Sequence, residues 1–173
     1  MKSLKVLCAI AIIASFFSCA YQEDTVAFFI EKIKHYCAIQ DRCQWETEKK
    51  LKEYGLDDDV IDSIMGDLIL EKYVDEQRFA ESFCRGKFRI KRWGKVKIKN
   101  ELKNRNISEN CINIGMSQID ETEYINNLEK FYKKKRDSLK DKNHFTRKGK
   151  IAKHLQQKGF ESNLIWDLIN KDK

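Results

Sequence analysis

Proline is absent from this chain of 173 residues, and only seven residues are glycine. Because these two residues most often interrupt helices, a chain so poor in them favours long helical segments. Charged residues, most of them good helix formers, make up 35% of the sequence, and strands are hard to place anywhere in it. We therefore predict an all-α fold.

The sequence also lacks the usual marks of an enzyme or a metal site. It contains no C-x-x-C pair, glycine-rich phosphate loop, nucleophile elbow or paired-acid signature. His35, His144 and His154 have no neighbouring cysteine or carboxylate spacing typical of a metal site. The three aspartates at 57–59 are better explained as helix-capping residues. We therefore expect no catalytic residue, no metal and no cofactor.

A loose repeat occurs three times along the chain. In each copy a leucine is followed by three mostly polar residues, a Gly or Asn, and an apolar residue; the copies begin at Leu51, Leu102 and Leu155. Gly and Asn readily take the left-handed conformation that ends a helix. The regular step predicts one helical unit used three times, as tandem three-helix repeats that form an elongated, curved array.

Net charge divides the chain unevenly. Residues 1–75 carry a net charge of −5, residues 76–119 of +7 and residues 120–173 of +5. Basic repeats suit a polyanion or an acidic protein surface, and the alternative is a solvated helix face rich in lysine. The expected segments are a leader over 1–22, an acidic first repeat over 23–74, a basic second repeat over 75–119 and a basic third repeat over 120–173.

The N-terminus resembles a bacterial lipoprotein signal. Lys2 and Lys5 precede an apolar run over residues 6–17, and Cys19 stands where the lipidated cysteine of such a signal would be. The run is too short for an ordinary transmembrane helix. A wrongly chosen start of the chain is the alternative, and both interpretations stay open.

The periodicity of apolar residues and the capping residues predict the helices. Their expected ranges are 25–39, 42–54, a helix beginning at 57 or 58, 76–93, 95–105, 109–119, 121–140, 147–158 and 161–170. Asp41, Ser108 and Thr146 are the expected N-caps, and Asp75 and Asp120 open the second and third units.

Two spaced blocks in the middle of the chain resemble the RecX family of recombination regulators. The first runs from Asp75 through Arg78, Phe79 and Ala80 and resembles the family's D-x-x-R-F-A-x segment. The second, residues 94–107, resembles G-x-x-R-I-x-x-E-L-x-x-K-G-I, with Lys97 in place of Arg and Asn106 in place of Gly. The resemblance covers about residues 28–170, and the leader has no counterpart in this cytoplasmic family.

The resemblance implies a non-enzymatic protein that binds the RecA recombinase along the groove of its filament on single-stranded DNA. Members of the family typically inhibit strand exchange, ATP hydrolysis and co-protease activity, by blocking filament extension or promoting disassembly. This role belongs to homologous recombination, DNA repair and the SOS response, and implies a cytoplasmic location. An elongated monomer is the default expectation for the free protein.

The expected binding face lies where basic residues are densest, with Trp93 as an anchor. Its members are Arg78, Arg85, Lys87, Arg89, Lys91, Arg92, Trp93, Lys95 and Lys97. On one continuous helix, positions 78, 85, 89 and 92 would form a stripe. Arg78 has an alternative role in a local pair with Asp75, and Phe79, Phe83 and Leu102 are expected in the core.

Two other functions remain open. One is a membrane-tethered protein, acylated at Cys19, whose basic helical units face an anionic partner or a lipid surface. The other is a general nucleic-acid-binding protein that needs no recombinase. Mass spectrometry of the N-terminus tests the first, and salt-sensitive DNA binding without an effect on RecA would favour the second.

Overall fold

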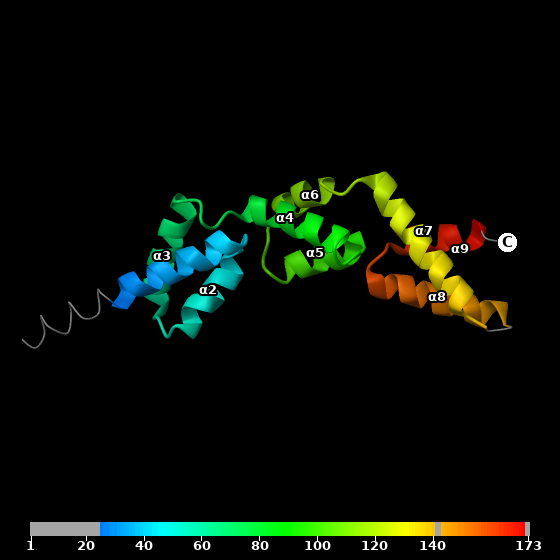
Figure 1. Cartoon of the computed structure of the whole chain (residues 1–173), viewed down its shortest axis with the longest axis horizontal. Coiled ribbons are helices and arrows are strands. Elements are labelled where there is room, and N and C mark those ends of the chain that lie inside the picture. The colour runs from blue at the N-terminus through cyan, green and yellow to red at the C-terminus, as the bar shows by residue number, and fades with distance from the viewer. Residues whose placement is uncertain (1–24, 141–142, 172–173) are drawn as a thin grey trace, which may run out of the picture. The chain divides into compact units, whose positions relative to one another are not determined.

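The computed structural model of the chain describes residues 25–140 and 143–171 (Figure 1). Within these residues the chain forms nine helices and no strand, so the expected all-α fold is confirmed. The leader expected over residues 1–22, with Cys19, lies outside the described residues. The chain divides into two compact units, with the boundary between Val74 and Asp75.

The first unit contains one three-helix domain, which we call the first domain. Its helices span residues 25–39, Gln44–Glu53 (α2) and Asp58–Leu70 (α3). On α3 the buried residues recur every three or four positions, so that one face of the helix is apolar. This face joins a single core made of Ile33, Cys37, Leu51, Ile61, Ile64, Met65, Leu68 and Val74.

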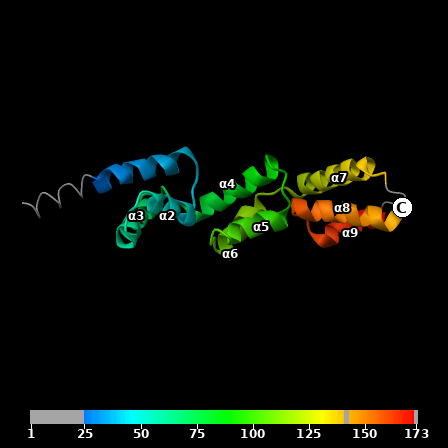
Figure 2. The ribbon, with the colours of Figure 1, turned by 90° about the horizontal axis from the view of Figure 1, so that it is seen from below.

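The second unit contains two further three-helix domains. The second domain consists of α4 (Glu76–Arg89), α5 (Lys95–Lys103) and α6 (Glu109–Ser117). The third domain consists of α7 (Glu121–Ser138), α8 (His144–Lys158) and α9 (Ser162–Lys171). In each domain the helices pack against one another, with α5 and α6 beside α4 and with α8 between α7 and α9 (Figures 1 and 2).

The repeated Gly or Asn positions end helices as predicted. The backbone φ angle is +78° at Gly55, +58° at Asn106 and +92° at Gly159, all in the left-handed region. The next residue closes the helix end in two copies, because the N–H groups of Ile107 and Phe160 donate to carbonyls five residues earlier, at 3.2 Å. Both of these apolar residues are buried.

Several expected helix starts are confirmed. The side chain of Asp75 accepts a hydrogen bond from the backbone N–H of Arg78 at 2.9 Å, and Asp120 accepts one from Glu123 at 2.7 Å. The hydroxyl of Ser108 caps α6 in the same way. Each cap satisfies a backbone N–H that the helix itself leaves without a partner.

Two expected caps are wrong. Helix α2 begins at Gln44, two residues later than predicted, so Asp41 lies outside its first turn. Helix α8 begins at His144, and its cap is Asn143, whose side-chain oxygen accepts hydrogen bonds from Phe145 and Thr146. An amide and a hydroxyl three residues apart both favour an N-cap, and the earlier one gives the longer helix.

The second and third domains meet at two glycines. The N–H of Gly94 donates to the carbonyl of Lys158 at 2.8 Å, and the N–H of Val96 donates to the carbonyl of Gly159 at 3.0 Å. A Cβ added to Gly94 would lie 2.1 Å from the carbonyl oxygen of Gly159, so the backbones touch directly. The end of α8 thus supplies acceptors that the start of α5 needs.

Tyr124 completes this junction from α7. Its side chain is fully buried, and its ring packs against Phe88 and Phe160. The Tyr124 hydroxyl accepts a hydrogen bond from the N–H of Lys95 at 3.0 Å and donates one to the carboxylate of Glu161. Burial, and next the hydrogen bond with Glu161, raises the pKa of Tyr124 far above its ordinary value, so the hydroxyl stays protonated.

We predict that the Gly159→Ala substitution lowers the free energy of unfolding by roughly 2–4 kcal/mol, because the new methyl group meets both a left-handed backbone and close contacts. Its Cβ would lie 2.2 Å from the Cβ of Lys97. Urea unfolding followed by circular dichroism measures the effect. The matched control is Gly149→Ala in α8, where a Cβ meets nothing within 4 Å; it should stabilise by about 0.5–1 kcal/mol. Equal stability of the two variants would contradict the close contact.

A second prediction concerns the thiols, which are free at Cys37, Cys43, Cys84 and Cys111. Burial raises the pKa of the Cys84 thiol to about 12, so almost none is thiolate at pH 8. Cys111 is only partly buried. Iodoacetamide should therefore label Cys111 well before Cys84 in the folded chain, and both at similar rates in urea, as measured by peptide mass spectrometry. Labelling of Cys84 first in the folded chain would contradict its burial.

Candidate interaction surface

The nine residues expected at the binding face lie on α4, on the turn that follows it and on the start of α5. One geometric premise was wrong, because α4 ends at Arg89 and not at Trp93. Arg92 has a left-handed backbone, with φ of +55°, and the N–H of Trp93 closes the helix by donating to the carbonyl of Lys87. Arg92 therefore leaves the stripe that Arg78 would share with Arg85 and Arg89 on α4.

Arg92 and Lys95 face the third domain. The guanidinium of Arg92 lies 3.2 Å from the carboxylate of Glu123 and donates to the side-chain oxygen of Asn127 at 3.3 Å. The ammonium group of Lys95 forms a salt bridge with Glu121. These two cations therefore hold α7 against the second domain, a role that sequence reasoning did not assign to them.

On α4, Arg85 forms a salt bridge with Glu81 at 3.8 Å, one turn earlier. Arg78 contributes its backbone N–H to the cap at Asp75, and its side chain is exposed. The local pair between Arg78 and Asp75 thus involves the Arg78 backbone. An exposed ion pair between residues one helical turn apart, such as Arg85 and Glu81, contributes only about 0.3–0.5 kcal/mol to stability.

Four of the eight cations among these nine residues make no salt bridge with any residue of the described chain. They are Lys87, Arg89, Lys91 and Lys97. Their charges are therefore not neutralised by any described residue, unlike those of Arg85, Arg92 and Lys95. The sequence alone does not show this difference, because the acidic partners of Arg92 and Lys95 lie in α7, about 30 residues further along the chain.

Two of these lysines belong to a line of alternating cations and rings on α4, α5 and the turns that follow these two helices. Arg105 lies 5.1 Å from the ring centroid of Phe83, and Lys87 lies 4.9 Å from Phe83 and 5.1 Å from Trp93. Lys97 lies 4.3 Å from Trp93. All four distances are within the range of cation–π attraction. We call these five residues the cation–aromatic ladder.

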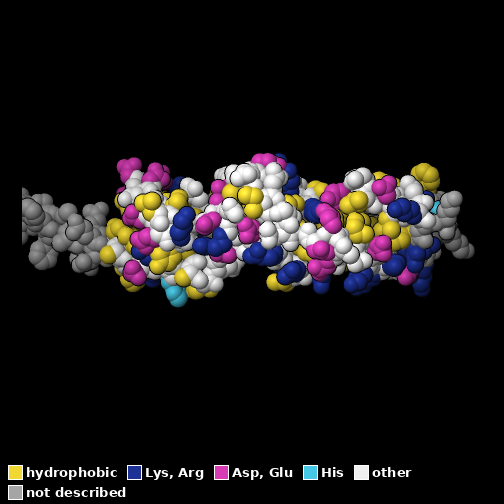
Figure 3. Space-filling model, turned by 90° about the horizontal axis from the view of Figure 1, so that it is seen from above, with side chains coloured by type: hydrophobic (Ala, Val, Ile, Leu, Met, Phe, Trp, Pro, Cys, Tyr) yellow, Lys and Arg dark blue, Asp and Glu magenta, His cyan; other side chains and the backbone are white. Residues whose placement is uncertain are grey.

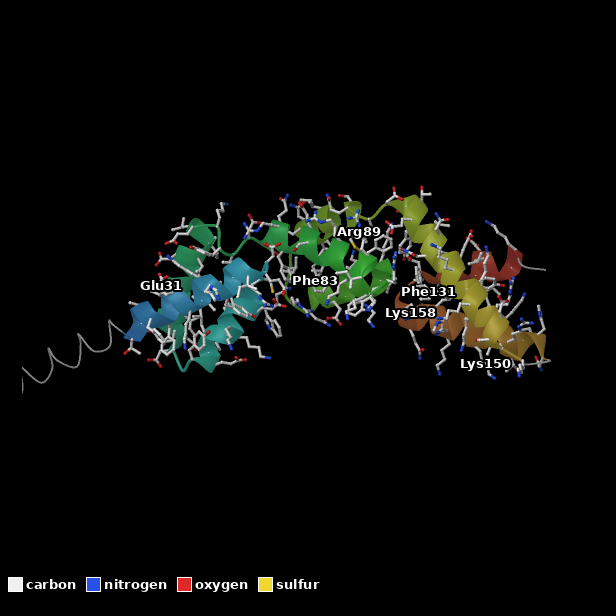
Figure 4. All side chains as sticks on the ribbon, in the orientation of Figure 1. Glu31, Phe83, Arg89, Phe131, Lys150 and Lys158 are labelled. Carbon is white, nitrogen blue, oxygen red and sulfur yellow. The ribbon has the colours of Figure 1, made fainter. Side chains whose placement is uncertain are left out.

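The ladder revises the expectation for Phe83. Phe83 was expected in the core, but it is half-buried and holds Arg105 and Lys87 on its ring. Figure 4 shows Phe83 on the side of α4 toward α5, and Arg89 on the upper side of the helix, away from Phe83. The spacing of Phe83 and Lys87 by four residues signals their contact, whereas nothing in the sequence signals that of Arg105.

The ladder fixes positive charge in place at the surface. Aromatic rings hold the lysine stems while the ammonium groups stay near water. Such an arrangement attracts phosphate groups or carboxylates, and contains no nucleophile or base that would act on a substrate. Among the described residues, no three His, Cys, Asp or Glu side chains lie together in a way that would hold a metal ion.

A second basic region lies in the third domain. Helix α8 contains five Lys or Arg residues and no Asp or Glu. On the face shown in Figure 3, Lys and Arg side chains dominate the lower edge of the right half of the view. Burial, with Lys135 and Lys158 nearby, lowers the pKa of His154, so this histidine adds no charge at neutral pH.

None of the helices that the structure describes combines the length and apolar character needed to cross a membrane.

Solved structures share this fold. A regulatory protein RecX structure superposes with a TM-score of 0.76 over 87% of this chain and 73% of that chain, at 22% sequence identity. RecX from Lactobacillus salivarius gives a TM-score of 0.74 over 87% of this chain and 97% of that chain, also at 22% identity. At this level of identity the likeness concerns the fold alone.

Curated relatives are similar in sequence over most of this chain. Regulatory protein RecX of Oceanobacillus iheyensis is 30% identical over 150 residues, which are 87% of this chain and 55% of the relative. The Clostridioides difficile protein of that name is 28% identical over 73% of this chain and 61% of its own length. The chain thus spans somewhat more than half the length of these two relatives.

Two family models match the second unit. The model of the second three-helix domain of RecX matches residues 75–116, and that of the third matches residues 121–169. These ranges contain the junction at Gly94 and Gly159 and the whole cation–aromatic ladder. With the shared fold and the similar relatives, they establish that this chain belongs to the RecX family.

Proposed function

We propose that this chain binds the RecA recombinase filament on single-stranded DNA and inhibits its ATP hydrolysis, strand exchange and co-protease activity. Membership of the RecX family carries the proposal, together with relatives that are named regulatory proteins. The chain would act by binding and not by catalysis. Its proposed domains are 23–74, 75–119 and 120–173, and its proposed location is the cytoplasm, where recombinase filaments form.

The cation–aromatic ladder is the part of the surface that we assign to this contact. Lys87 and Lys97 make no salt bridge within the described chain, and Trp93 holds both ammonium groups on its ring. Phosphates of the DNA and acidic side chains of the filament are both suitable partners for such charges. Affinity spread over several exposed charges should decrease as the salt concentration increases.

Single-stranded-DNA-dependent ATP hydrolysis by the cognate RecA, titrated with the full chain, tests the proposal. Loss of hydrolysis at substoichiometric protein supports filament regulation, because one bound molecule then stops several recombinase subunits. No effect at excess folded protein would contradict it. Salt-sensitive DNA binding in the absence of any effect on hydrolysis would favour a general nucleic-acid-binding protein instead.

We predict that replacing Lys87 and Lys97 together by Gln raises the concentration needed for half-inhibition by roughly tenfold, because two fixed charges are lost. Circular dichroism should show unchanged helicity. The matched control replaces Lys32 and Lys49, which also lie over aromatic rings but belong to the first domain. Equal potency of the ladder variant and this control would exclude the ladder as the contact.

A further inference from the structure

Two segments of the chain carry charge of one sign only. Residues 57–71 contain six Asp or Glu and no Lys or Arg, whereas residues 85–97 contain seven Lys or Arg and no Asp or Glu. The acidic segment includes all of α3, in the first unit. The basic segment runs from the end of α4 to the start of α5, in the second unit. Each copy of the chain therefore offers two surfaces of opposite charge.

In each of these segments one large aliphatic side chain is far more exposed than the others. Leu70, the last residue of α3, is 80% exposed, and Ile90, which follows α4, is 78% exposed. No other large aliphatic side chain of the described residues has so large an exposed fraction. Contact of such side chains with water is unfavourable, so burying them against another apolar surface favours association.

The acidic surface lies on one side of α3, because Asp62, Gly66 and Leu70 follow one another at four positions and Asp67 is three positions before Leu70. We call Asp62, Gly66, Asp67 and Leu70 the α3 patch; all four are exposed. Within the described chain, neither aspartate makes a salt bridge. A Cβ added at Gly66 would meet nothing within 4 Å, so a partner has free approach to this face.

The basic surface consists of Arg89, Ile90 and Lys91, which we call the α4-end patch. All three are exposed, and neither cation has an acidic partner among the described residues. Arg89 lies about 120° around α4 from Phe83, given 3.6 residues per turn. Arg89 is therefore directed away from the cation–aromatic ladder, and the α4-end patch has no residue in common with it.

We propose that the α3 patch of one copy binds the α4-end patch of a second copy, so that copies of this chain associate head to tail. Leu70 packs on Ile90, and the aspartates face Arg89 and Lys91. Because the two patches differ, each pair of copies leaves one patch of each kind unoccupied, and further copies add at the ends.

Seven residues make a small contact, so the association of free copies is weak. Copies held next to one another on a filament have a high effective concentration, and a weak contact then makes their binding cooperative. This last step rests on the proposed function. The head-to-tail contact itself does not, and it is tested on the free protein without any recombinase.

Sedimentation velocity of the full chain tests the contact directly. At about 50 mM salt the weight-average sedimentation coefficient should rise with protein concentration, and at about 500 mM salt the rise should disappear, because ions screen the facing charges. If the sedimentation coefficient at low salt keeps the monomer value at every protein concentration, the proposal is overturned.

Charge reversals identify the patches. Asp67→Lys alone and Lys91→Glu alone should each weaken association by roughly tenfold or more, because like charges then face each other. The double variant should regain association. A mixture of the two single variants should also regain association, because alternating copies then pair two unchanged patches at one contact and two reversed patches at the next.

Control reversals separate the patches from a general effect of charge. Asp167→Lys and Lys153→Glu change exposed helical positions that make no salt bridge in the described chain. Both should associate like the unchanged protein. Association that is unaffected by Asp67→Lys and Lys91→Glu would overturn the proposal, whatever the outcome of the ATP hydrolysis experiment.

Discussion

The hydrogen bonds between the start of α5 and the end of α8 determine the arrangement of the second unit. Three successive N–H groups, of Gly94, Lys95 and Val96, donate to acceptors in the third domain. A helix start normally leaves such groups without partners, and here another domain supplies them. Neither helix end is complete on its own. We therefore expect the second and third domains to unfold as one cooperative unit and not as independent repeats.

The same junction sorts the basic residues of the second domain by role. Arg92 and Lys95 reach acidic residues of α7 and strengthen the junction, so their charges are largely neutralised. Lys87 and Lys97 lie over Trp93 without an acidic partner in the described chain, and they leave positive charge for another molecule. Density of Lys and Arg in the sequence thus combines cations that pair with α7 with cations that have no acidic partner in the described chain.

Local residue preferences predicted where most helices lie, whereas long-range packing determines the end of α4 and the contacts between the helices. Gly55, Asn106 and Gly159 end helices as their backbone preferences indicate. The early end of α4 was not predictable, because it needs Arg92 in a conformation that arginine rarely adopts. The meeting of Gly94 with Gly159 joins residues 65 positions apart, and no local pattern encodes such a pair. The same holds for Arg105 in the ladder.

Packing of lysine stems on aromatic rings has an entropic consequence. A free lysine side chain samples many rotamers, and fixing it in a complex costs about 0.5–1.5 kcal/mol. In the ladder, Trp93 and Phe83 restrict Lys87 already in the isolated protein, and Trp93 restricts Lys97. Much of this entropy is lost when the chain folds, so a binding partner meets charges that are preorganised. The ladder therefore favours a tighter contact than the same number of mobile lysines would give.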